Sequence, residues 1–104
     1  MTQRYRDVLD YEIRARIFVE FETRGRDVMD YAVVLTIDED DGGVATVRLY
    51  DGAHGINEMH RFDRAGRKAA AETVHAGTLG EGMRAAITAV RTGHEEMIEA
   101  WRAT

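Results

Sequence analysis

The chain lacks several residue types that enzymes and secreted domains commonly use. Its 104 residues include no cysteine, no proline and no serine. The lack of cysteine excludes disulfide bonds, a thiol nucleophile and thiolate metal centres. The lack of proline excludes a cis-proline switch and a proline-rich linker. Any catalysis would therefore rest on histidine, carboxylate, threonine or tyrosine side chains.

The charge balance and the apolar runs exclude further classes. The formal net charge is −5, whereas broad, non-specific binding to nucleic-acid phosphates needs a basic surface. A local basic patch stays open. No apolar run approaches the ~20 residues that span a bilayer, and the first residues, MTQRYRDVLDYE, lack the apolar stretch of a signal peptide. We expect a cytoplasmic protein with no membrane partner.

Residues 1–104 contain no internal repeat, no low-complexity segment and no break in composition. Apolar residues make up 44% and charged residues 32% of the chain, as in soluble globular proteins. A chain of this length is long enough for one hydrophobic core. We therefore expect a single domain.

Strand patterns occupy the first two thirds of the chain. Apolar residues alternate with polar ones over 11–22, which is typical of a strand with one buried face. Residues 28–38 are apolar on both faces, which indicates a central strand. Two further strands are predicted at 44–50 and 56–63. The alanine-rich segment 69–75 fits either a helix or a short fifth strand, and we favour the strand.

The last third of the chain has a helical pattern. From Leu79 to Trp101, apolar residues recur at alternating steps of three and four, which places them on one helix face. Thr78 and Glu81 form the S/T-x-x-E pattern of a capping box at the start. The sequence thus predicts an α+β domain, an antiparallel meander of four to five strands followed by one long C-terminal helix packed on one sheet face.

One helix covers only one face of such a sheet. Phe18, Val28, Ala32 and Val34 are predicted on the other face, where exposure to water would forfeit several kcal/mol at ~25 cal/mol per Å². A homodimer or another protein partner would cover them. The alternatives are a sheet that curls on itself or N-terminal residues that fold over it.

The segment YDGAHGINEMHRFD, residues 50–63, concentrates candidate functional residues. Asp51-Gly52 is a favoured pair for a tight turn, so the plain interpretation is a hairpin with His54 exposed at its tip. On that interpretation, Glu58 and His60 point to one side of the following strand, and Arg61 points to the other.

Two functional hypotheses compete with the plain hairpin. In the first, His54 and His60 are an acid–base pair and Arg61 stabilises phosphate charge, as a metal-independent ribonuclease requires. In the second, His54, Glu58 and His60, with or without Asp51, bind a divalent metal, although no recognised ligand spacing is present.

The longer run YDGAHGINEMHRFDRAGRK resembles a segment of small uncharacterised prokaryotic proteins, some of which are similar to TumE-type toxin components of toxin–antitoxin pairs. That resemblance implies a catalytic role for His54 and His60, with RNA as the substrate. From the sequence we expect a non-catalytic dimeric or partner-binding domain without a cofactor, and the toxin-like ribonuclease is the alternative.

Overall fold

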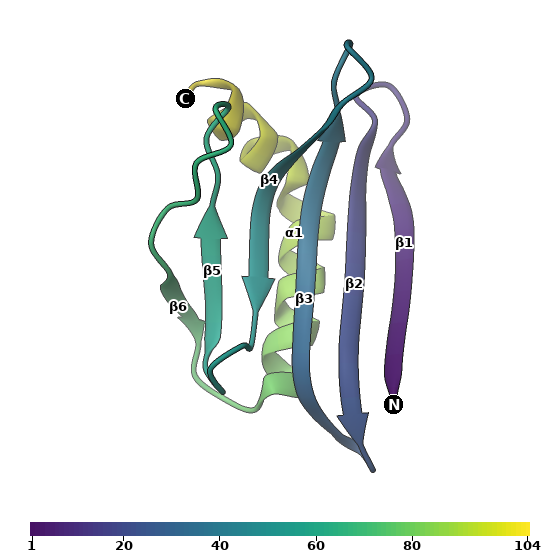
Figure 1. Ribbon diagram of the computed structural model, residues 1–104, viewed down its shortest axis with the longest axis vertical. Coiled ribbons are helices and arrows are strands. Elements are labelled where there is room, and N and C mark those ends of the chain that lie inside the picture. Colours follow the sequence, from purple (N-terminus) through teal and green to yellow (C-terminus); the bar gives the residue numbers. More distant parts are fainter.

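The computed structural model describes all 104 residues as six strands followed by one helix (Figure 1). The strands form one antiparallel sheet in the order β1-β2-β3-β4-β5-β6, so each strand pairs with its neighbours in the sequence. The single helix lies across one face of this sheet, which confirms the α+β meander. The elements are β1 (Thr2–Asp10), β2 (Ala15–Arg24), β3 (Asp27–Asp38), β4 (Val44–Asp51), β5 (Asn57–Arg61), β6 (Glu72–His75) and α1 (Leu79–Arg102).

The predicted number of strands, four to five, is too small because the sequence analysis missed β1. The predicted first strand also began too early, since the chain turns between Asp10 and Ala15. The Asp10 carboxylate accepts hydrogen bonds from the backbone N–H groups of Glu12 and Ile13, at 2.9 and 3.2 Å. Arg14 has a positive φ of 55°. The alternation of apolar residues runs through this turn by coincidence and conceals it.

The extended interpretation of segment 69–75 is confirmed in its second half. Glu72–His75 forms β6, which pairs antiparallel with β5 and lies at one edge of the sheet. β1 lies at the other edge. Strands β2 to β5 therefore have a neighbour on both sides.

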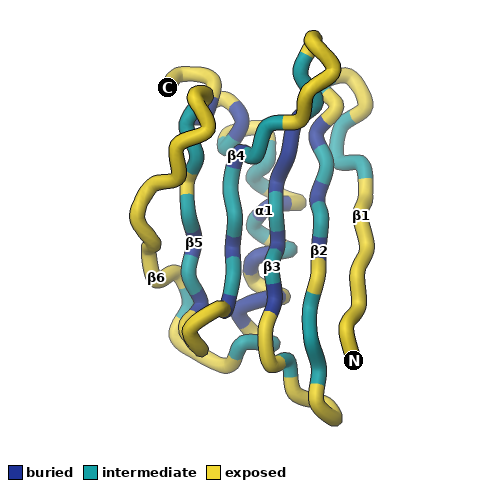
Figure 2. The backbone as a smooth tube through the Cα atoms, viewed as in Figure 1, coloured by how far each residue is buried: buried dark blue, intermediate teal, exposed yellow.

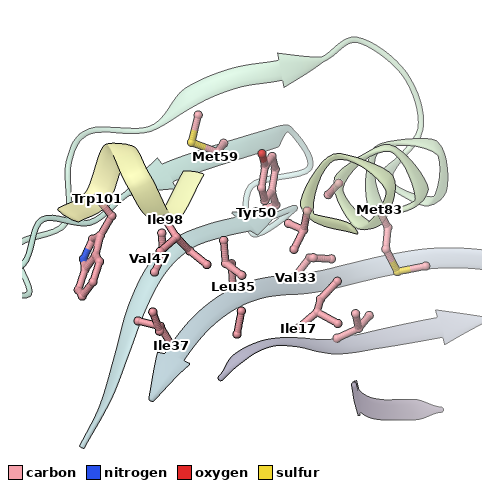
Figure 3. Close-up of a cluster of buried hydrophobic side chains, with 14 of the residues drawn as sticks. Ile17, Val33, Leu35, Ile37, Val47, Tyr50, Met59, Met83, Ile98 and Trp101 are labelled. Carbon is pink, nitrogen blue, oxygen red and sulfur yellow. The ribbon is translucent and has the colours of Figure 1, made fainter. Parts of the chain in front are cut away.

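The core lies between α1 and the face of the sheet that it covers (Figure 3). Alternate residues of β2 and β3 point into it, and the helix contributes residues at helical spacing. Complete burial of one such aliphatic side chain contributes about 1.5–3 kcal/mol. The buried apolar residues are Ala15, Ile17, Val19, Tyr31, Val33, Leu35, Ile37, Val47, Tyr50, Met59, Met83, Ala86, Val90, Ile98 and Trp101.

The helix begins where the sequence predicts. The Thr78 hydroxyl accepts a hydrogen bond from the backbone N–H of Glu81 at 3.2 Å, and the Glu81 carboxylate accepts one from the backbone N–H of Thr78 at 3.3 Å. This confirms the capping box. The hydrogen bonds from Thr78 hold the pKa of Glu81 below its ordinary value. α1, the single helix, lacks the sustained apolar stretch that a membrane-spanning helix requires.

A buried asparagine fixes the first turn of α1 to the sheet. Asn57 is 1% exposed, and its Nδ2 donates to the backbone carbonyls of His75, Gly77 and Thr78 at 3.2–3.3 Å. The hydroxyl of Tyr31 donates to its Oδ1 at 2.8 Å. Gly82 packs directly against this amide, since a Cβ there would lie 1.8 Å from Oδ1. We call this group of contacts the Asn57 latch.

Candidate functional site

The sheet face opposite α1 has no covering element, and Figure 1 shows it in front of the helix. We call it the open face and define it by two rows of residues that pair across the strands. The first row is Arg6, Phe18, Val34, Leu49 and His60; the second is Arg4, Glu20, Ala32, Asp51, Glu58 and Thr73. Each row alternates with the core-facing residues of the same strands, so its side chains point away from α1.

The first row carries apolar side chains across the centre of the open face. Phe18, Val34 and Leu49 are paired neighbours on β2, β3 and β4. All three are half-buried, whereas Ile17 and Val33 beside them are 0% exposed. Figure 2 shows the same alternation of buried and half-buried residues along β2 and β3. The predicted placement of Phe18, Ala32 and Val34 on the uncovered face agrees with this pairing.

The prediction for Val28 is wrong. A shift in register after Glu22 pairs Thr23 with Val28, so one residue of β3 is passed over and the alternation changes side. Val28 packs against the core, beside Gly80 in the first turn of α1. This single bulge places Val28 on the covered face. The alternation of apolar and polar residues in the sequence does not reveal such a bulge.

Opposite charges occupy opposite ends of the open face. At the β1 end, Arg4 donates to the Glu20 carboxylate at 2.9 Å, and Arg6 has no ion-pair partner. At the β4–β5 end, Asp51 and Glu58 are paired neighbours in the second row. Glu58 forms no ion pair. The open face is therefore apolar at its centre, with the unpaired charge of Arg6 at one end, where Arg4 is paired with Glu20, and the carboxylates of Asp51 and Glu58 at the other.

The open face is hollowed at its β1 end. A shallow depression of about 410 Å³ lies between the arginines of β1 and the apolar residues of β2 and β3. Its floor includes Phe18, Ala32 and Val34, and Arg4 and Arg6 stand at its side. The depression has the apolar floor and charged rim of a binding surface for a protein side chain.

His60 lies on the open face next to Asp51. Its Nε2 is 3.9 Å from the Asp51 carboxylate, and its Nδ1 lies 3.0 Å from the backbone carbonyl of Ala69. The side chains of His60 and Asp51 are 15% and 16% exposed. Because a backbone carbonyl can only accept, Nδ1 is the ring nitrogen that donates to Ala69.

The other two predicted site residues do not accompany His60. His54 is exposed in the loop between β4 and β5, and His60 lies about 10 Å along β5 from the end of that loop, at ~3.4 Å per residue. Arg61 points to the opposite side of the sheet, where its Nε donates to the Glu72 carboxylate at 3.0 Å. Of the residues in segment 50–63, the structure brings together Asp51, Glu58 and His60.

The β4–β5 loop differs in detail from the predicted tight turn. The turn bond runs from the N–H of Gly55 to the carbonyl of Gly52 at 3.0 Å, and Gly55 rather than Gly52 has the positive φ, 72°. Gly52 is buried, and a Cβ there would lie 2.8 Å from Leu79 and 3.0 Å from Tyr31. Glycine at position 52 therefore serves close packing beneath α1 rather than the turn.

A separate group of metal-ligand types lies near the turn after β1. One ligand atom each from Asp10, His94 and Glu95 lie within 4.8 Å of one another. Asp10 already accepts two backbone hydrogen bonds, His94 Nδ1 lies 3.1 Å from the Arg91 carbonyl, and Glu95 is exposed without a hydrogen bond. No contact fixes Glu95 as a ligand, so the group is a surface cluster.

Sequence reasoning missed Arg4 and Arg6 because β1 itself was missed. A signal was present, since TQRYRDVLD places Arg4, Arg6 and Val8 at alternate positions. The strand carries few apolar residues, because an edge strand at the border of the helix buries little surface. Only the pairing with β2 shows that both arginines share a face with Phe18.

One family model matches this chain, whereas the comparisons with curated proteins and with solved structures give no match. A family model described as "Domain of unknown function (DUF7718)" matches residues 1–104, which is the entire length of the meander and its helix. The chain belongs to the DUF7718 family.

Proposed function

We propose that this chain is a non-catalytic interaction domain that binds a protein chain through the open face. The observation that carries the proposal is the row of Phe18, Val34 and Leu49, which crosses the centre of a sheet face without cover. Antiparallel sheets that face water on one side normally carry polar residues there. Three large apolar neighbours at the centre of that side are the pattern of a contact surface.

Removing this apolar row from water would contribute measurably to the free energy of binding a partner. Each 100 Å² of apolar surface removed from water contributes about 2.5 kcal/mol at ~25 cal/mol per Å². The charged residues at both ends of the row give a polar rim around an apolar centre, as in protein interfaces. The open face therefore combines the driving force for association with groups that specify orientation.

The ribonuclease alternative has less support from the geometry. It requires His54, His60 and Arg61 to act on one phosphate, whereas His54 lies in the exposed loop and Arg61 faces away from His60. Expression of the chain in a bacterial host, with RNA integrity and growth as readouts, tests this alternative. RNA cleavage that disappears in both His54→Ala and His60→Ala would replace the interaction proposal with the enzymatic one.

The interaction proposal is tested by one substitution at the centre of the open face. We expect the tagged chain, expressed at low level, to migrate in a complex larger than its own mass of 11.7 kDa. Val34→Glu should shift it to the mass of the single chain, because a carboxylate at the centre of an apolar contact is costly to bury. Ala85→Glu, at an exposed position of α1, is the matched control and should keep the complex. Identical migration of all three proteins would contradict the proposal.

A further inference from the structure

We infer that the free edge of β1 binds an extended, acidic segment of another protein, which adds to the sheet as one more strand. This edge is separate from the open face, so the contact goes beyond the one proposed above. β1 borders the sheet on one side, and no other element of the chain lies beyond it (Figure 1). Residues 2–7 of this strand are all exposed.

The backbone groups of every second residue in β1 point away from the sheet. Met1 and Thr23 exchange two hydrogen bonds, from the Thr23 N–H to the Met1 carbonyl at 3.0 Å and from the Met1 nitrogen to the Thr23 carbonyl at 2.8 Å. In an antiparallel ladder such pairs recur every two residues. The odd-numbered residues of β1 therefore bond to β2, whereas the N–H and C=O groups of Thr2, Arg4 and Arg6 face outward.

Asp7 provides an independent check on this alternation. Its carboxylate accepts a hydrogen bond from the backbone N–H of Val8 at 2.9 Å, as expected for an outward-facing group. The same contact closes the edge at Val8, just before the register shift between Val8 and Asp10. The open part of the edge thus runs from Thr2 to Arg6, where three successive outward positions offer a donor and an acceptor.

The opposite edge of the sheet is protected in ways that β1 is not. β6 is only four residues long, Glu72–His75, and its pairing with β5 shifts register between Asn57 and Glu58. Short edge strands and bulges prevent the addition of further strands to natural sheets. β1 has nine residues, no proline and a regular register up to Val8. It is therefore the edge that can accept another strand.

The arginines of β1 determine the charge of the added strand. Arg4 and Arg6 occupy outward positions and point to the open face, where Arg4 is paired with Glu20. Arg6 has no ion-pair partner. Residues directly opposite on antiparallel strands have Cβ atoms about 4.5–5.5 Å apart, and opposite charges there stabilise the pairing. A carboxylate opposite Arg6 therefore makes the contact that the chain itself does not supply.

The other side of β1 favours an apolar residue in the added strand. Tyr5 points to this side, since it pairs with Val19 of the core, and yet it remains 42% exposed. An aromatic or aliphatic side chain on the added strand would cover the tyrosine ring. The segment that fits this edge is thus extended, acidic on one side and apolar on the other.

A second copy of this chain does not meet the requirement for an acidic strand. When two β1 strands pair antiparallel, residues of the same face come opposite each other. In each register that gives both arginines a partner within residues 2–8, Arg4 lies opposite Arg4, Arg4 opposite Arg6, or Arg6 opposite Arg6. Like charges directly opposite destabilise a sheet. The occupant is therefore a different protein.

Amide hydrogen exchange of the purified chain tests this edge directly. In the free protein the amides of Arg4 and Arg6 should exchange rapidly, whereas those of Gln3 and Tyr5, which bond to β2, should be protected. A synthetic peptide of alternating glutamate and valine should slow exchange at Arg4 and Arg6, and the equivalent peptide of lysine and valine should not. Unchanged exchange of these two amides with the glutamate peptide would overturn the inference. Equal protection by both peptides would overturn the acidic character of the partner.

Self-pairing has its own signature in the same measurement. Protection of the Arg4 and Arg6 amides in the chain alone, increasing with its concentration, would identify a second copy as the occupant and overturn the assignment to another protein. Exchange that is rapid at every concentration supports the assignment.

Two substitutions separate the backbone contact from the charge contact. Arg4→Pro removes an outward N–H without breaking a bond between β1 and β2, so it should abolish binding of the labelled glutamate peptide in fluorescence anisotropy. Arg4→Ala keeps the N–H, and it is the matched control that should bind within a few-fold of the original. Equal binding by these two variants would overturn strand addition.

The charge contact is tested at Arg6. Arg6→Glu should weaken binding of the glutamate peptide about fivefold or more and admit the lysine peptide, because it reverses the sign opposite the added strand. Arg84→Glu, at an exposed position of α1, is the charge control and should leave binding unchanged. An equal loss in both variants would mean that net charge, and not the pairing at the edge, selects the peptide. Far-UV circular dichroism of each variant verifies that the fold is intact.

Discussion

The two faces of the sheet are built from the same strands, and alternate residues of β2 and β3 supply both of them. On the covered face, Ile17, Val33 and Leu35 are 0% exposed beneath α1. On the open face, Phe18 and Val34 are their direct neighbours in the sequence and remain half-buried. Residue type alone therefore does not determine burial here, because the position of one helix decides which apolar row becomes a core.

The faces also differ in how they treat polar groups. The covered face buries Asn57 and Tyr31 and connects them by hydrogen bonds to each other and to backbone carbonyls. The open face leaves Arg6 and Glu58 without ion-pair partners. A polar group that is fully bonded within the chain stabilises that chain, whereas an unpaired charge at the border of an apolar patch is free to select a partner.

The largest difference between the two faces is expected when one leucine on each face is truncated to alanine. Leu35→Ala, in the core, should reduce the free energy of unfolding by about 2–5 kcal/mol through lost burial and a cavity. Leu49→Ala, at a half-buried position of the open face, should cost less than about 1 kcal/mol in the monomer. Urea unfolding at a protein concentration low enough to separate any dimer measures both. Equal losses would mean that the two faces do not differ as described.

The Asn57 latch provides a second test of the covered face. Gly82→Ala should destabilise the fold by about 1–3 kcal/mol or more, because the new Cβ meets the amide of Asn57 at 1.8 Å. Asn57→Ala should cost about 1–3 kcal/mol, because it leaves the Tyr31 hydroxyl without its acceptor and removes one donor from three backbone carbonyls. The double variant should lose less than the sum, since the shortened side chain makes room for the new methyl group. Strict additivity in chemical denaturation would contradict the direct contact.

The buried tyrosine makes the stability of the covered face depend on pH in the alkaline range. Burial raises the pKa of Tyr31 to about 12, and the charge of Asp51 contributes to the increase. Because the folded-state pKa exceeds the ordinary value of 10.0, this contribution to stability is complete below pH 10 and declines as the pH rises toward 12. Tyr31→Phe should flatten the decline in unfolding free energy between pH 10 and pH 12. An unchanged profile in that interval would show that other groups cause the decline.

The smallest effect is expected at His60. His60→Ala should change the free energy of unfolding of the monomer by less than about 1 kcal/mol, because its neighbour Asp51 is also near the surface and the histidine lies outside the core. The same variant should weaken the complex formed through the open face, since His60 pairs with Leu49 at the end of the apolar row. Thermal unfolding and sedimentation of one preparation measure the two effects. A large loss of stability with unchanged association would mean that His60 stabilises the fold and not the complex.

The sequence predicted those elements of the fold in which the spacing of apolar residues is regular over a continuous segment. The spacing from Leu79 to Trp101 and the Thr78–Glu81 pair identified α1 to the residue, and the extended pattern of 28–38 identified β3 with one residue missing at its start. β1 was not predicted, because six of its nine residues are exposed and the apolar alternation that leads into β2 begins within the turn at residues 11–14.

From the sequence, the candidate site could be predicted only as an uncovered sheet face and not as a set of neighbouring residues. Phe18 and Val34 indicated an uncovered face, but the pairing of Arg6 with Phe18 and of Leu49 with His60 depends on strand register. Register arises from turns and bulges that are distant from the residues concerned, and a shift by one position changes the face of every side chain. The same sensitivity explains why Val28 was assigned to the wrong face.

The meander order has a consequence for how the chain folds during synthesis. Every strand pairs with the strand made just before it, so the sheet can form progressively from contacts that are near in sequence, a topology that favours rapid folding. The helix that covers Ile17, Val33 and Leu35 is translated after all six strands. The nascent sheet therefore exposes two apolar faces until α1 leaves the ribosome.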